Sequence, residues 1–288
     1  MMTTAMSWTI SEGEDFDAAR AMALIEELER ESAHVRPIKT RPGRKVFRIP
    51  TRHTGGGVLI AKYHCARSFR ERLKYAVLPT RAAREWKNAE RLRVAGVPVP
   101  DMLALGECYA HGLWARAVLF ARAVAPGTAL NDQLLTSPPA AEVRRLAARL
   151  AAHVAHLHDA GYQAGDLHGW NILLRQTGDG LDLCFVDLDE MRVRRRSALR
   201  RCAADLARLG VLAPARRFTK MRFLVNYLRA RHVPRQRWRK WIGEIAKRAA
   251  RIAAGLKQKY GREPDEFIRW FAAERQVKKG DCNLSQNT

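Results

Sequence analysis

The pattern of apolar and polar residues changes character part-way along the chain. Before about residue 125, runs of alternating residues predict β-strands, with turn residues such as HTGGG and a His-Gly pair between them. These runs are KVFRIP, VLIAKYH, MLALGECYA and LWARAVLFARAV. From about residue 138, helical spacing dominates, and only NILLR and LDLCFVDL, joined by a TGDG turn, still alternate. The order predicts an α+β fold in which a small antiparallel β part precedes a mostly α part.

Three stretches carry clear helix signals. FDAARAMALIEELERES, within residues 15–34, is amphipathic with an acidic face. A long helical stretch follows VLIAKYH, and its later part, TRAAREWKNAERLRVAG, has Thr80 as an N-cap and Gly96 as a stop. SPPAAEVRRLAARLAAHVAHLHDAG begins with prolines and ends at Gly161, so it predicts a long helix. Everything after residue 197 also reads as helical.

Composition narrows the possible settings. The 288 residues are 47% apolar, which suits one large two-lobed domain or two domains. The 52 Lys and Arg against 29 Asp and Glu give a net charge of +23, which predicts attraction to nucleic acid, an anionic membrane or a phosphorylated glycan. Five scattered cysteines without a CxxC pair indicate reduced thiols and a cytoplasmic chain. We see neither a secretory signal nor an uncharged window long enough to span a membrane.

Five polar residues stand at positions suited to phosphoryl transfer. Lys62 ends a predicted strand and Glu85 lies in the next helix, whereas Asp166, Asn171 and Asp187 flank the two later strands. A Lys braced by a Glu can hold phosphates, and an Asp can orient a hydroxyl and accept its proton. An Asn and a second Asp offer the oxygen ligands that magnesium prefers. Each residue alone has an ordinary explanation, such as a surface Lys or a turn-capping Asp, but their shared order makes coincidence improbable.

The motifs around these residues resemble those of a known family. GDLHGWNILL is similar to the loop of atypical bacterial kinases, and REWKNAERLRVAGVPVP resembles a region of the lipopolysaccharide core kinases, which phosphorylate Kdo or heptose. The segments 187–189 (DLD) and 205–209 (DLARL) also resemble that family. The resemblance covers roughly residues 38–212. It implies a two-lobed protein-kinase-like fold: an N-terminal helical extension (1–37), an antiparallel N-lobe with one main helix (38–125) and a mostly α C-lobe with a basic helical end (126–288).

The resemblance also implies a role for each site residue. Asp166 would be the catalytic carboxylate, and Asn171 and Asp187 would hold Mg²⁺. Lys62 and Glu85 would form the ion pair that positions the phosphates of ATP. Glu90 is an alternative to Glu85 in that pair. The backbone of Phe120, Ala121 and Ala123, in the connection between lobes, would face adenine.

The sequence departs from the usual kinase pattern in three places. Ala164 stands where a His normally braces the catalytic loop, so another group must hold that loop. Asp189 replaces the glycine of the DFG motif, which adds a carboxylate close to the metal ligands. No GxGxxG is present, so the turn at residues 41–44 would have to cover the phosphates.

Histidines and basic clusters leave alternatives open. His153, His156 and His158 do not share one helical face, so we favour packing over zinc. His168 lies close to the chemistry or is structural, and Trp170 packs or lines the acceptor groove. The arginine run of MRVRRRSALRR (191–201) is either a solvated face or a contact for acceptor anions. RQRWRKW (235–241) suits an anionic membrane or nucleic acid, and we favour the membrane.

The sequence therefore predicts an ATP- and Mg²⁺-dependent kinase for a sugar of the lipopolysaccharide inner core. It would act on a glycolipid at the cytoplasmic face of the inner membrane of a Gram-negative-type bacterium, in peripheral contact with anionic lipid. The alternatives are another small-molecule or protein kinase of the same fold, a nucleic-acid-binding protein without catalysis, and a degraded kinase. The acceptor hydroxyl and the oligomeric state are left open.

Overall fold

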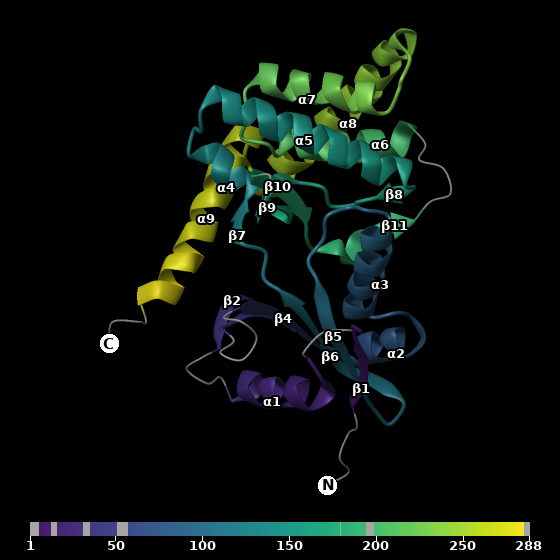
Figure 1. The fold of residues 1–288 in the computed structure, drawn as a ribbon, viewed down its shortest axis with the longest axis vertical. Helices are drawn as coiled ribbons and strands as arrows, with labels where there is room; N and C mark the ends of the chain where they lie inside the picture. Colours follow the sequence, from purple (N-terminus) through teal and green to yellow (C-terminus); the bar gives the residue numbers. More distant parts are fainter. Residues whose placement is uncertain are drawn as a thin grey trace. The chain divides into compact units, whose positions relative to one another are not determined.

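The computed structural model describes residues 6–12, 16–30, 35–50, 57–178, 180–193 and 199–284. Its backbone divides into two compact units. The first unit comprises Met1–Glu90, Pro100–Ala123 and Arg275–Thr288, and the second comprises Arg91–Val99 and Val124–Glu274. Figure 1 labels the elements of both units.

The first unit is built on a six-stranded antiparallel sheet. In spatial order its strands are β1 (Met6–Ile10), β5 (Met102–Ala110), β6 (Leu113–Arg122), β4 (Val58–Cys65), β3 (Arg44–Pro50) and β2 (Arg36–Arg41). Strands β3, β4, β5 and β6 confirm the four alternating runs of the sequence. The two edge strands were not predicted, because MSWTI is short and RPIKTR carries a proline and three bases, residues that suit a sheet edge rather than its centre.

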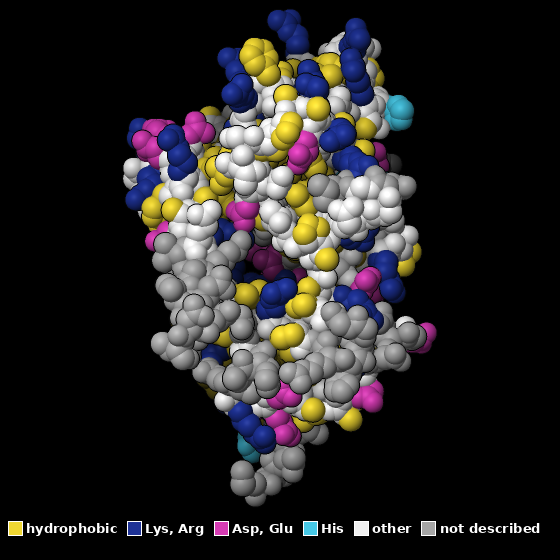
Figure 2. All heavy atoms as spheres, turned by 60° about the vertical axis from the view of Figure 1, so that its left-hand side comes forward, with side chains coloured by type: hydrophobic (Ala, Val, Ile, Leu, Met, Phe, Trp, Pro, Cys, Tyr) yellow, Lys and Arg dark blue, Asp and Glu magenta, His cyan; other side chains and the backbone are white. Residues whose placement is uncertain are grey.

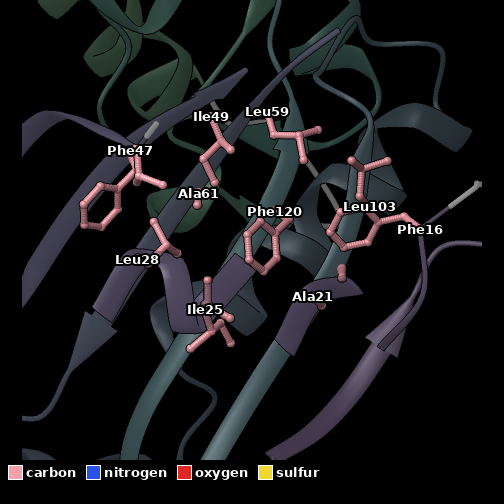
Figure 3. Packing of buried hydrophobic residues seen from close by; sticks show 13 residues of the cluster. Phe16, Ala21, Ile25, Leu28, Phe47, Ile49, Leu59, Ala61, Leu103 and Phe120 are labelled. Atoms are coloured by element: carbon pink, nitrogen blue, oxygen red, sulfur yellow. The ribbon is translucent and has the colours of Figure 1, made fainter. Parts of the chain in front are cut away.

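Helix α1 (Ala18–Glu29) covers one face of this sheet and confirms the amphipathic helix expected within residues 15–34. Asp17 caps it by accepting a hydrogen bond from the backbone of Arg20 at 2.7 Å. Figure 3 shows Ile25 and Leu28 of α1 beside Phe120 of β6, which also packs against Phe16 with ring centroids 5.5 Å apart. The sheet and α1 therefore share one apolar core.

The predicted long helical stretch forms two helices, α2 (Phe69–Val77) and α3 (Arg81–Val94), separated at Pro79. Ser68 caps α2, and Thr80 caps α3 by accepting from the backbone N–H of Ala83 at 3.0 Å. Gly96 follows α3 with a positive φ of 71°, as expected for a helix stop.

The second unit is mostly helical. Its helices are α4 (Leu130–Leu135), α5 (Ala140–Asp159), α6 (Leu199–Val211), α7 (Arg217–Ala230), α8 (Arg235–Tyr260) and the part of α9 (Pro264–Leu284) that precedes Arg275. Helix α5 packs on α7 and α6 packs on α8 (Figure 1). None of the helices in the described ranges is both long and apolar enough to cross a membrane.

Two small antiparallel sheets hold the loop regions of the second unit. One has the order β10 (Gly180–Phe185), β9 (Ile172–Thr177) and β7 (Pro126–Ala129), and the other pairs β8 (Tyr162–Gln163) with β11 (Arg192–Val193). Strands β9 and β10 are the two predicted after the opening of the α part. Two short 3-10 turns carry residues of the expected site. The turn η1 (Gly169–Asn171) lies at the end of the loop that precedes β9, and η2 (Leu188–Glu190) follows β10.

Candidate active site

Within the first unit, Lys62 and Glu85 form a close ion pair. Lys62 lies on β4, in the middle of the sheet between β3 and β6, and its Nζ is 2.6 Å from Oε1 of Glu85 on α3. The two side chains are only 14% and 4% exposed. Glu90 is exposed on the same helix, so the structure brings Lys62 to Glu85 rather than to its rival. A largely dehydrated cation fixed by one carboxylate is suited to binding a polyanion.

In the second unit, the loop from Ala164 to Asn171 presents the expected carboxylate. Gly165 has a φ of +76°, and a Cβ there would lie 2.8 Å from the backbone oxygen of Glu190, so this turn requires glycine. Asp166 follows it with a half-buried side chain. Asn171 ends the loop, and its amide Nδ2 donates to the backbone oxygen of Asp166 at 3.1 Å. The loop therefore closes on itself through the two residues that the sequence had paired.

An arginine and a histidine lie on opposite oxygens of the Asp166 carboxylate. Nη1 of Arg208, on α6, donates to Oδ1 at 2.8 Å, and Nε2 of His168 lies 3.5 Å from Oδ2. The pKa of Asp166 is lowered by His168 first and by Arg208 as well, against the effects of burial and of the nearby Asp187 carboxylate, which raise it. Asp166 is therefore ionised at neutral pH, as an acceptor of a hydroxyl proton must be.

Asn171 and Asp187 fit a hard divalent cation. The hydrogen bond from Nδ2 to Asp166 orients the Asn171 amide so that its oxygen points away from that contact and can serve as a ligand. Asp187 adopts a left-handed conformation, with φ 56° and ψ 58°, at the start of η2, and its side chain makes no capping hydrogen bond there. Its charge disfavours ionisation of Asp166, and a bound cation would relieve this repulsion.

A buried aspartate does the bracing that Ala164 cannot do. Asp205 on α6 is 2% exposed, and its carboxylate accepts the backbone N–H groups of Ala164 at 2.8 Å and Gly165 at 3.2 Å. Its Oδ2 also lies 3.2 Å from Nε2 of His158, whose Nδ1 contacts the Tyr227 hydroxyl at 2.7 Å. The group that holds the loop is therefore an acid from a later helix.

The DLARL motif contains Asp205 and Arg208, but the sequence alone indicates no role for either residue. They lie three positions apart on α6, so they share the helix face that meets the loop. The available signal was an acid and a base at this spacing among the apolar residues that follow Arg201 in this helix. What they contact could not be read from the sequence, because their partners lie about forty residues earlier in the chain.

The backbone connection expected to face adenine is partly engaged within the first unit. Phe120 and Ala121 pair with β4 on one side and β5 on the other, and the Phe120 side chain lies in the sheet core. The N–H of Ala123 donates to the backbone oxygen of Val58 at 2.8 Å. An adenine contact by these three residues stays a prediction.

The remaining sequence candidates are mostly structural. Trp170 is buried, donates to Asp132 at 3.0 Å and packs against Phe271. His153 pairs with Asp182 and His156 contacts the backbone oxygen of Ala95, so neither forms a cluster with His158. Among described residues no group of three His, Cys, Asp or Glu side chains is arranged to hold a metal.

The two basic clusters of the sequence are the arginine run at 191–201 and the segment RQRWRKW at 235–241. Residues 194–198, in the middle of the arginine run at 191–201, lie outside the described residues. In RQRWRKW, Trp241 is buried against Tyr227, and Trp238 donates its indole N–H to the backbone oxygen of Val233 at 2.8 Å. The bases of this cluster are exposed, and Figure 2 shows Lys and Arg side chains at the top of the view, where α7 and α8 lie. The cluster therefore offers charge without exposed tryptophans.

The model of the lipopolysaccharide kinase (Kdo/WaaP) family matches residues 19–227 of this sequence. The chain belongs to this family. Among solved structures it is similar to WaaP in complex with acyl carrier protein, at 22% identity over 85% of this chain and 98% of that chain, with a TM-score of 0.59. It also matches the kinase domain of PknI from Mycobacterium tuberculosis, a double mutant, at 15% identity over 62% and 70% of the two chains, with a TM-score of 0.39. No curated protein matches the sequence significantly.

These likenesses confirm the predicted family and the predicted fold. The antiparallel sheet unit and the helical unit correspond to the N-lobe and C-lobe of a protein-kinase-like fold. Membership of a kinase family supports phosphotransferase activity, and kinases use ATP, typically with a divalent metal.

Proposed function

We propose that this protein is an ATP- and Mg²⁺-dependent kinase that phosphorylates Kdo or heptose in the inner core of lipopolysaccharide. One observation carries the proposal beyond family membership. His168 and Arg208 lower the pKa of Asp166, its loop also presents Asn171, and the charge of Asp187 is close enough to affect Asp166. A base and two oxygen ligands are the groups that phosphoryl transfer to an alcohol needs.

The proposed chemistry assigns each group one task. The acceptor hydroxyl oxygen bonds to the γ-phosphorus, the bond from phosphorus to the β,γ-bridging oxygen breaks, and ADP leaves with that electron pair. Asp166 orients the hydroxyl and accepts its proton. Asn171 and Asp187 hold Mg²⁺, which neutralises charge on the phosphates when it is bound.

Lys62 binds phosphate oxygens of ATP in this proposal, and Glu85 keeps its ammonium group in place. A Lys whose only role was to balance a buried Glu would show the same contact, so nucleotide affinity is the quantity to measure. Backbone groups of Phe120, Ala121 and Ala123 remain the proposed adenine contacts.

The proposed setting is the cytoplasmic face of the inner membrane of a Gram-negative-type bacterium, where the acceptor would be a membrane glycolipid. The family match and the net charge of +23 support a substrate that carries phosphates or carboxylates on an anionic surface. Catalytically inert binding of nucleic acid would use the same charge, but it gives no reason for the arrangement around Asp166.

The test supplies ATP, Mg²⁺ and a lipid bearing Kdo or heptose, and follows acceptor mass. We expect a gain of about 80 Da for each phosphate transferred. Asp166→Asn should lower the rate by about 100-fold or more, since general-base catalysis typically contributes about 10² to 10⁴. Glu190→Gln, which removes an exposed acid from the neighbouring η2, is the matched control and should be active.

Three outcomes would contradict this assignment. Transfer by Asp166→Asn at the unmodified rate would remove the proposed base. Transfer to aminoglycosides or generic proteins, with none to core glycolipid, would favour another kinase of the same fold. Binding of DNA or RNA that falls steeply with salt, is indifferent to Asp166→Asn and occurs without turnover would favour the nucleic-acid alternative.

A further inference from the structure

Helix α2 of the first unit exposes a row of large apolar side chains. Phe69, Leu73 and Val77 are 65%, 52% and 82% exposed, and Leu78 just beyond the helix is also exposed. Residues four apart on a helix are offset by about 40°, so the three side chains form one continuous stripe. Single exposed apolar residues are ordinary, but a contiguous row on one short helix marks a contact surface.

The orientation of this row is fixed by the opposite face of the helix. Tyr75 is buried and packs edge-on against Trp114 of β6, with ring centroids 4.9 Å apart. Arg72 donates to the backbone oxygen of Ala110 at 3.4 Å, and Ser68 caps the first turn. Because these contacts anchor α2 to the sheet, the apolar row faces away from the core of the first unit.

Bases flank the row and no exposed acid accompanies them on this helix. Arg67, Arg70 and Lys74 are exposed. The acid of the segment, Glu71, is half-buried, and its carboxylate accepts the backbone N–H of Arg67 at 3.0 Å. The surface therefore combines an apolar stripe with a net positive border.

We propose that α2 is a membrane-docking surface, with Phe69, Leu73 and Val77 entering the head-group boundary of an anionic bilayer. Acyl chains accept the apolar stripe, and anionic head groups accept Arg67, Arg70 and Lys74, each base near such a surface adding about 1 kcal/mol. The inference goes beyond the proposed kinase function, since it needs neither nucleotide nor glycolipid acceptor.

Other occupants fit this surface less well. A second copy of the chain would bring like charges together. In addition, a helix of nine residues, about 13 Å long, offers too little area for a stable dimer interface. Nucleic acid would use the bases and could stack on Phe69, but it has no complement for Leu73 and Val77. Helix α8 is basic too, but apart from Ile242 its large apolar side chains are buried or half-buried, so it can add attraction without insertion.

The experiment measures partition of the full chain onto sedimented vesicles, without ATP or lipopolysaccharide. The vesicles are phosphatidylcholine alone, or phosphatidylcholine with about 30% phosphatidylglycerol, which supplies the anionic charge. We expect binding to the anionic vesicles only. The triple variant Phe69→Ser/Leu73→Ser/Val77→Ser should bind at least tenfold more weakly, equal to about 1.4 kcal/mol.

Matched controls separate insertion from a general loss of apolar surface or charge. Val94→Ser and Phe218→Ser each remove an exposed apolar side chain elsewhere and should bind as the unmodified chain does. Arg70→Glu/Lys74→Glu should weaken binding more than Arg239→Glu/Lys240→Glu on α8. If the triple variant does not fold, Val77→Asp alone carries the test, because a charge at that exposed position opposes insertion without touching the core.

Three results would overturn the proposal. These are unchanged vesicle binding by the triple variant, equal losses in the Val94 and Phe218 controls, or a dimer of the unmodified chain that the triple variant abolishes. Because no phosphate transfer is measured, failure here leaves the kinase assignment standing. Conversely, an inactive protein that binds vesicles through α2 leaves the docking surface standing.

Discussion

Replacing Asp205 with asparagine should strongly destabilise the second unit and loosen the catalytic loop. The substitution keeps the size of the side chain but exchanges one acceptor oxygen for an NH₂ group. The carboxylate meets three donors: the backbone N–H groups of Ala164 and Gly165, at 2.8 and 3.2 Å, and His158 Nε2 at 3.2 Å. With its oxygen in the place of Oδ2, an amide still accepts from Ala164 and His158, and its NH₂ group then faces the N–H of Gly165.

The magnitude follows from those contacts. A hydrogen bond to a charged group contributes about 1.5 to 3 kcal/mol, and a buried donor left without an acceptor costs about 1 to 3 kcal/mol. The lost contact to Gly165, its unpaired buried N–H and the loss of charge at the two remaining contacts should together lower the free energy of unfolding by about 3 to 5 kcal/mol, in the range measured for breaking buried ion pairs. That is a large share of the roughly 5 to 15 kcal/mol that stabilises a typical domain.

Urea unfolding followed by circular dichroism measures the loss, with Asp101→Asn, an exposed aspartate, as control. Amide hydrogen exchange on the unmodified chain gives a second readout that does not depend on the variant folding. The N–H of Ala164, although in a loop, should exchange as slowly as helix-core amides. A loss below about 1 kcal/mol, together with fast exchange at Ala164, would refute the brace.

Three further predictions concern neighbouring charges. Glu85→Gln should raise the KM for ATP by about ten- to a hundredfold, because Lys62 loses a charged partner at 2.6 Å, whereas Glu90→Gln should leave steady-state kinetics unchanged. Arg208→Ala should lower kcat with little effect on the KM for ATP. It should also move the acid limb of the kcat–pH profile to higher pH, because a cation that lowers the pKa of Asp166 is gone. An acid limb at the same pH would show that Arg208 does not set the pKa of Asp166. Burial alone would lower the pKa of His158, but its hydrogen bond to the Asp205 carboxylate and the proximity of Cys202 raise it above 6.5, so its stabilising contribution is complete below about pH 6.5 and lost as pH rises through the raised value. The difference in unfolding free energy between the unmodified chain and His158→Gln should thus be larger at about pH 5.5 than at about pH 8.5, and a difference independent of pH would contradict it.

Local signals predicted much of the fold, because they are strong in this sequence. The central strands alternate over whole segments, and helix α3 carries both a cap and a glycine stop, Thr80 and Gly96. The edge strand β1 was missed because MSWTI is short, and β2 because edge pairing tolerates proline and charge, which weakens the pattern. The sequence predicted one long helical stretch where the structure has two helices, α2 and α3. Pro79 lies at the break between them.

At the candidate site, the sequence predicted which residue types come in which order but not what holds them. Lys62 and Glu85 were paired from their places on a strand and the next helix, and the structure brings them together. The contacts of Asp205 and Arg208 arise only when α6 folds against a loop far earlier in the chain. The packing of the aromatic-basic segment (235–241) was not predicted either. RQRWRKW looks like a surface motif, but helical spacing directs Trp241 into the packing around Tyr227.

The left-handed backbone at Asp187 has a consequence for how this protein can lose its activity. At φ 56° and ψ 58°, most side chains are disfavoured, whereas Gly, Asn and Asp are tolerated. Of these three, only Asp offers a carboxylate to a metal. With Asp187 in its proposed role as a metal ligand, a single base change in its codon, which yields Asn or Gly, would give a folded but inactive descendant. The fold alone does not preserve the carboxylate at this position, and only a requirement for catalysis would.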